Sequence, residues 1–99
     1  MGMTMSELLD LRVCATARAE EAGADECHVA YHRGAANAVR SVLFPLASGE
    51  VVTRRELEQR LDKLKVRTLQ PWNLRYAAYW SGAVDALEFI LDRWAAAAA

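Results

Sequence analysis

YHRGAANAVRSVL at positions 31–43 and YWSGAVDALEFIL at positions 79–91 decide the fold of this 99-residue chain. The two stretches agree at five of thirteen positions, and two further pairs exchange one aliphatic residue for another. Every aligned pair is offset by 48 residues. Such an ordered correspondence predicts two similar helices and an internal duplication of the chain.

Small residues share one face of each stretch, one helical turn apart. A tyrosine lies one turn before each small pair, so its ring can cover the flank of the notch that the small residues leave. Such a notch lets a second backbone approach closely, and we expect the two helices to cross near Gly34 and Gly82. The predicted helix-packing residues are Tyr31, Gly34, Ala38, Tyr79, Gly82 and Ala86.

Two capping boxes mark helix starts. Thr4 is followed three residues later by Glu7, and Thr53 is followed by Glu56 at the same spacing. In each box the threonine hydroxyl can accept the glutamate N–H, while the glutamate reaches back to the threonine N–H. The boxes are offset by 49 residues, so they extend the repeat to a helix that precedes each matched stretch.

Breaking and capping residues separate the helices within each half. Gly23 and Pro71 are predicted to end the first helix of each half, and Asp25 and Asn73 can cap the second. Pro45 is predicted to stop the second helix of the first half. The expected helices cover residues 5–22, 26–43, 54–69 and 74–94, with a central connection at 44–51. The last helix is expected to end at Trp94 or to continue into the alanine tail.

These elements predict an all-α fold in which two duplicated αα-hairpins pack about a pseudo-two-fold axis as a four-helix bundle. The hairpins span about residues 4–44 and 53–94, within a single domain of residues 1–94. An alanine tail follows at 95–99. No stretch alternates strictly enough to predict a strand.

Charge is nearly balanced along the chain. Twelve basic and thirteen acidic residues give a net charge of −1, which provides no general affinity for nucleic acid or acidic membranes. The longest uncharged stretches are about half the length of a membrane span. Cys14 and Cys27 lie in unrelated contexts, which is typical of reduced thiols. The expected location is therefore the cytoplasm.

The two histidines offer a metal site as an alternative to packing. His28 and His32 are four residues apart on one helix, and Cys14 of a neighbouring helix could supply a thiolate. The equivalent positions in the second half hold Tyr76 and Trp80, which indicates a preference for flat rings rather than for ligands. No metal or other cofactor is expected. Nucleophile elbows and phosphate loops are absent from the sequence, so we expect no enzyme.

The last helix has more apolar circumference than one helix of a four-helix monomer normally buries. This excess predicts a homodimer and a surface for a partner protein, because Trp and Tyr dominate interface energetics. The predicted partner-binding residues are Trp72, Tyr76, Trp80, Leu87 and Trp94.

The helix at 54–69 carries a local excess of positive charge and offers an alternative function. Its start resembles the beginning of a helix-turn-helix, although Pro71 falls within the would-be recognition helix. The alternative is a nucleic-acid-binding transcriptional regulator, with its contacts at Arg54, Arg55, Arg60, Lys63, Lys65 and Arg67.

The stretch at 79–91 also resembles a segment of short phage-encoded or actinobacterial helical proteins of unassigned role. The resemblance implies a small viral or accessory protein, and it implies no catalytic or binding residue. The expected function is therefore that of a small protein–protein interaction module, and the resemblance implies a phage or mobile-element accessory protein.

Overall fold

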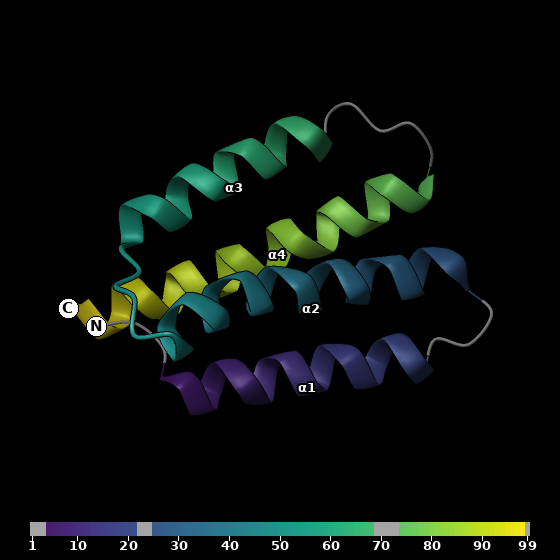
Figure 1. Ribbon diagram of the computed structural model, residues 1–99. Helices are drawn as coiled ribbons and strands as arrows, with labels where there is room; N and C mark the ends of the chain where they lie inside the picture. The colour runs from purple at the N-terminus through teal and green to yellow at the C-terminus, as the bar shows by residue number, and fades with distance from the viewer. Residues whose placement is uncertain (1–3, 22–24, 69–73, 99) are drawn as a thin grey trace.

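The computed structural model describes residues 4–21, 25–68 and 74–98 as a helical bundle (Figure 1). Its helices are α1 (Met5–Glu21), α2 (Glu26–Ala47), α3 (Arg54–Thr68) and α4 (Leu74–Ala98). No strand occurs among the described residues, so the all-α prediction is confirmed. The predicted stops at Gly23 and Pro71 and the predicted cap at Asn73 lie outside these residues.

Helices α2 and α4 form the central pair of the bundle. They run side by side in the same direction, with α1 packed on α2 and α3 packed on α4 (Figure 1). Within the described part of the chain, the backbones of α1 and α3 do not come into contact with each other. The outer edges between α3 and α2 and between α1 and α4 are consequently less closed than the three packed pairs.

Capping residues begin the helices as the sequence indicates. Thr4 and Glu7 form a complete box, in which Glu7 N donates to Thr4 Oγ1 at 3.1 Å and Thr4 N donates to Glu7 Oε1 at 3.3 Å. Asp25 Oδ1 accepts from the backbone N–H groups of Cys27 and His28, both at 3.1 Å. These hydrogen bonds satisfy donors that a helix N-terminus leaves without partners.

The predicted end of α2 at Leu43 is wrong, because the helix continues through Pro45 to Ala47. Proline lacks the N–H that would bond to the Ser41 carbonyl one turn earlier. Arg60 Nη1 of α3 donates to that Ser41 oxygen at 2.9 Å, so the carbonyl has a partner from outside its own helix. Gly49, at φ +82°, then ends the helix in a Schellman motif.

The core uses the same positions in both hairpins. Leu8 of α1 and its offset counterpart Leu57 of α3 are both 0% exposed. The six largest fully buried side chains form three such pairs, namely Leu8 with Leu57, Val39 with Leu87, and Val42 with Ile90. The interior of one hairpin therefore repeats in the other.

The crossing of α2 and α4 shows the same reciprocity. A Cβ added to Gly34 would overlap the backbone carbonyl of Tyr79, and one added to Gly82 would overlap the carbonyl of Tyr31. No other residue type fits such an approach without moving a backbone. The expected crossing near these two glycines is present in the structure.

Candidate interaction groove

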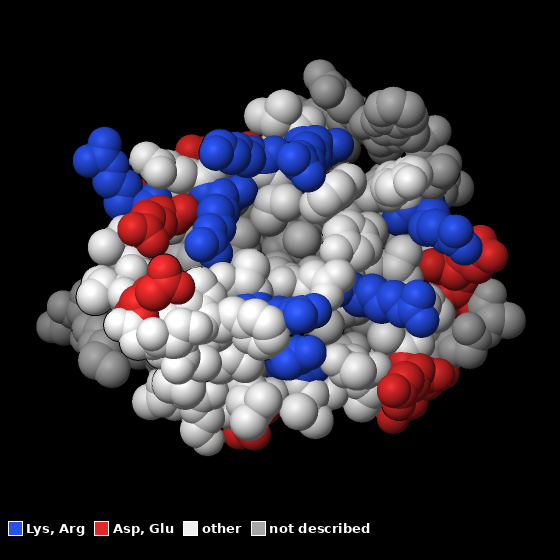
Figure 2. All heavy atoms as spheres, viewed as in Figure 1, with Lys and Arg blue, Asp and Glu red and all other residues white. Residues whose placement is uncertain are grey.

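A groove runs along the open edge between α2 and α3, over the side of α4. We call it the basic groove and define it by the small or buried Gly34, Ala38, Ala83 and Leu87, the polar Asn37 and Ser41, the half-buried Leu64, the aromatic Tyr79 and Trp80, and the cationic Arg60, Lys63 and Arg67. Figure 2 shows this face of the molecule as a hollow with Lys and Arg side chains above it along α3. The groove encloses about 290 Å³.

Three cations share the α3 wall of the basic groove because their spacing places them on one helical face. Arg60 is fixed by its hydrogen bond to the Ser41 carbonyl, and the Arg67 guanidinium lies over the Trp80 ring at 5.0 Å. Lys63 makes no ion pair among the described residues. No Asp or Glu occurs among the described lining residues, so nothing acidic in the groove offsets these charges.

A second groove lies between α1 and α4, and we call it the counterpart groove. Each lining residue of the basic groove has its equivalent there, at the same offset of 48 or 49 residues. The two grooves thus occupy equivalent places in the fold, one between α2 and α3 and the other between α1 and α4. Differences between them come from their side chains rather than from the fold. Leu11, Cys14 and Arg18 stand where the basic groove has its three cations.

Charge separates the two grooves. The counterpart groove holds Asp85 together with the single arginine Arg18. Tyr31 donates its hydroxyl to Asp85, and this hydrogen bond, together with burial and the nearby negative charge, raises the pKa of Tyr31 to about 12. In the basic groove Asn37 takes the place of the aspartate and donates from Nδ2 to Tyr79 Oη at 2.6 Å.

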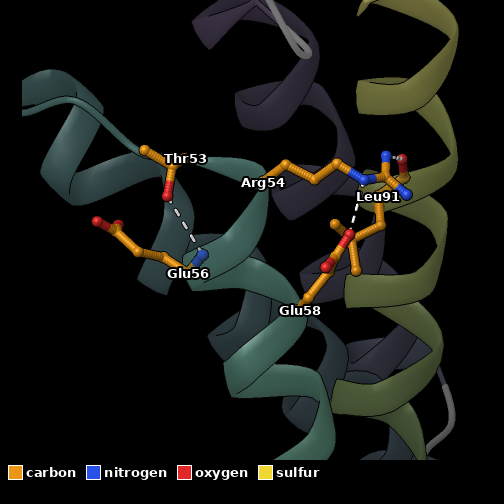
Figure 3. A network of polar contacts seen from close by, with 5 residues as sticks. All are labelled: Thr53, Arg54, Glu56, Glu58 and Leu91. Atoms are coloured by element: carbon orange, nitrogen blue, oxygen red, sulfur yellow. Dashed lines mark hydrogen bonds and ion pairs between the residues drawn. The ribbon is translucent and has the colours of Figure 1, made fainter.

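The remaining predicted nucleic-acid contacts lie apart from the groove. Arg54 pairs with Glu58 at 2.7 Å and donates to the Leu91 carbonyl at 3.2 Å (Figure 3). Lys65 pairs with Glu88 at 3.5 Å, and Arg55 is exposed without lining the groove. The structure therefore brings together Arg60, Lys63 and Arg67 of the six predicted residues.

The predicted partner-binding residues also do not form one surface. Leu87 and Trp94 are 1% and 9% exposed and belong to the hydrophobic core, because α4 packs against both α2 and α3. Tyr76 is exposed and Trp80 is half-buried, whereas Trp72 lies outside the described residues. Leu87 and Trp94 are thus covered within the chain and do not form an exposed apolar face.

The two histidines lie in different surroundings. His28 Nδ1 lies 3.3 Å from Asp25 Oδ2 at the exposed start of α2, whereas His32 lines the counterpart groove with Cys14. No group of three or more potential metal ligands gathers within residues 4–21, 25–68 and 74–98. None of the helices described is long and apolar enough to cross a membrane.

The sequence predicts the three cations of the groove as nucleic-acid contacts and Trp80 as a partner-binding residue, whereas the structure places them in one groove. Leu64 and Asn37 were missed, although the spacing of 60, 63, 64 and 67 marks one face of α3. Comparison of the chain with protein-family models, with curated proteins and with solved structures found no match.

Proposed function

We propose that this chain is a protein–protein interaction module that binds an acidic segment of a partner protein in the basic groove. The observation that carries this proposal is the difference between two equivalent grooves. One holds three cations with no carboxylate in its described lining, and the other holds one arginine with one aspartate. Arg60 also binds the Ser41 carbonyl, whereas no packing role accounts for Lys63, whose equivalent in the counterpart groove is Cys14. A ligand of opposite charge accounts for the positive charge at this position.

The shape of the groove favours a helical segment as the occupant. Two antiparallel helices, α2 and α3, form its walls, and the side of α4 forms its base. Its volume of about 290 Å³ is at the lower limit of small-molecule sites, and it suits a few side chains of a docked helix. Trp80 supplies the aromatic contact that interfaces favour.

Nucleic acid is the competing ligand for the same charges. The arrangement of the charges favours a protein partner over nucleic acid. Arg54 and Lys65 are engaged by Glu58 and Glu88, and this leaves a short row of cations rather than a continuous basic surface. Duplex binding requires many simultaneous phosphate contacts and therefore falls steeply with salt.

A labelled peptide tests the proposal. The probe is a synthetic helical peptide with Leu at one face and Glu at the flanks, and its binding is followed by fluorescence anisotropy. Lys63→Glu should weaken binding about tenfold, because one charge-assisted contact is replaced by a repulsion. Arg55→Glu, on the same helix but outside the groove, is the matched control and should change the affinity less than twofold.

Two results would overturn the proposal. One is equal weakening by Lys63→Glu and Arg55→Glu, which would reduce the binding to net charge. The other is tighter binding of a duplex DNA of similar length than of the peptide, with a steep loss of affinity as salt rises.

We extend the proposal to the origin and setting of the chain. The paired core positions, the reciprocal glycines and the matched grooves support an internal duplication of one hairpin. We propose a phage or mobile-element accessory protein acting in the cytoplasm, on the ground of the short helical sequence at 79–91. We also propose a homodimer, formed through a surface other than Leu87 and Trp94, which are buried within the chain.

A further inference from the structure

Hairpin α1–α2 exposes an apolar surface that takes no part in its core. Met5, Leu9 and Val13 recur every four residues along α1 and are 48%, 50% and 58% exposed. Phe44, near the end of α2, is 48% exposed. We call these four residues the apolar stripe.

The fold does not require the apolar stripe. The equivalent positions of the second hairpin are all exposed and all charged, so the same places in the architecture accept polar side chains without loss of packing. Those equivalents are Arg54, Glu58, Asp62 and Asp92. Isolated exposed apolar residues are common on any protein, but a row of four that replaces a row of four charges indicates a contact surface.

Phe44 connects the apolar stripe to the basic groove. Its ring is flanked by two guanidinium groups, Arg40 at 4.5 Å and Arg12 at 6.0 Å from the centroid. Along α2, Asn37 and Ser41 of the groove are followed by Phe44 at helical spacing, so all three lie on one side of the helix. Figure 2 shows that Lys and Arg occupy the middle of this face, while Asp and Glu lie toward its margins.

We propose that the partner segment is amphipathic and occupies both surfaces, with its carboxylates in the basic groove and its large apolar side chains on the apolar stripe. This inference rests on the proposed function and adds the apolar side chains of the ligand to its carboxylates. Charge complementarity selects the occupant, because Arg12 and Arg40 extend the positive charge of the groove to the edge of the stripe.

A second copy of the chain fits the stripe less well. A two-fold pairing of two apolar stripes would bring Arg12 and Arg40 of both copies toward one another. Juxtaposed like charges at an interface are strongly unfavourable. An acidic partner meets the same arginines with opposite charge.

Two peptides of equal length and equal negative charge distinguish the stripe from the groove. One is the Leu- and Glu-containing amphipathic helix, and the other has Gln in place of each Leu. The double variant Leu9→Ser with Phe44→Ser should weaken binding of the amphipathic peptide about tenfold and leave the affinity for the Gln-containing peptide within twofold. Val66→Ser, an exposed aliphatic residue of α3 outside both surfaces, is the control and should alter neither.

The outcomes separate the two proposals. If the double variant binds both peptides like the unmodified protein while Lys63→Glu weakens both, the stripe inference is overturned and the groove stands. If Lys63→Glu has no effect on either peptide, the proposed function is overturned and the stripe inference falls with it. Circular dichroism of each variant establishes that the helices persist.

Other occupants give distinct results, each of which would overturn the inference. Co-sedimentation with phosphatidylserine vesicles that is lost in the double variant, without a change in peptide affinity, would assign the stripe to a membrane. A doubling of the light-scattering mass with concentration that is abolished by the double variant would assign it to a second copy.

Discussion

Leu8 in α1 and Leu57 in α3 are equivalent residues, and both are fully buried. Cys14 and Lys63 are equivalent in the same two helices, yet one contributes a thiol and the other a positive charge to the groove beside it. The two hairpins therefore agree in their interiors and differ on their surfaces. Packing restrains the interior positions in the same way in both halves, whereas no such restraint acts on the exposed ones.

The difference locates function in the surface of the molecule. Where two equivalent positions carry different residues without a packing reason, we propose that the divergence reflects what the position contacts outside the chain. This argument selects the basic groove, which lies between α2 and α3, and the apolar stripe, which lies on α1 and α2.

The largest effect is expected at the crossing of the central helices. Gly34→Ala and Gly82→Ala each place a methyl group onto a backbone carbonyl, which neither Tyr79 nor Tyr31 can relieve by changing a rotamer. Each variant should lose about 3 kcal/mol of unfolding free energy, at the upper end of overpacking costs and despite a gain of about 1 kcal/mol in helix propensity. Urea unfolding measures both.

Equal losses would support the equivalence of the hairpins. A large loss at one glycine with no change at the other would contradict it, even if both variants stayed helical.

A smaller effect is expected where the central helices differ near their ends. Because Pro45 has no backbone N–H, the Ser41 carbonyl accepts a hydrogen bond from Arg60 instead. The equivalent residue of α4 is Arg93, which has a backbone N–H. Arg60→Ala should cost about 1 kcal/mol in the unmodified chain. The cost should be smaller when Pro45→Ala restores the backbone donor. Additive losses in this double-mutant cycle would show that Arg60 does not serve the Ser41 carbonyl.

The smallest effect concerns the two tyrosines that face each other's helices. The hydrogen bond to Asp85, together with burial and the negative charge of Asp85, raises the pKa of Tyr31 from 10.0 to about 12. The corresponding stability is complete below pH 10 and is lost as the pH rises toward 12. Asp85→Asn, which copies the Asn37 of the other groove, should lower that pKa. Phenolate absorbance measures it in a Tyr76→Phe and Tyr79→Phe background, where Tyr31 is the sole tyrosine. An unchanged midpoint would contradict the assigned cause.

Local signals predicted the helices well. Thr4 with Glu7 and Asp25 begin their helices through contacts within three residues, and sequence spacing contains that information. Gly34 and Gly82 were identified because the repeat placed them at the same point of two helices. The Schellman end at Gly49 was also available as a local signal, but Pro45 obscured it.

Nonlocal contacts account for what the sequence did not predict. The tolerance of Pro45 depends on Arg60, which lies on another helix, nineteen residues from the Ser41 carbonyl that it binds. The burial of Trp94 depends on the central position of α4, which its own apolar pattern does not specify. The basic groove likewise requires the open edge between α2 and α3, and only the packing of both helices on α4 creates it.

One matched pair of substitutions tests the central claim, which is that the basic groove, and not the counterpart groove, binds an acidic partner. Arg67 and Arg18 are equivalent, one in each groove, so Arg67→Glu and Arg18→Glu change the total charge identically. The amphipathic acidic peptide should lose at least tenfold in affinity for Arg67→Glu and less than twofold for Arg18→Glu, as measured by fluorescence anisotropy at one ionic strength. Equal losses for the two variants would contradict the account.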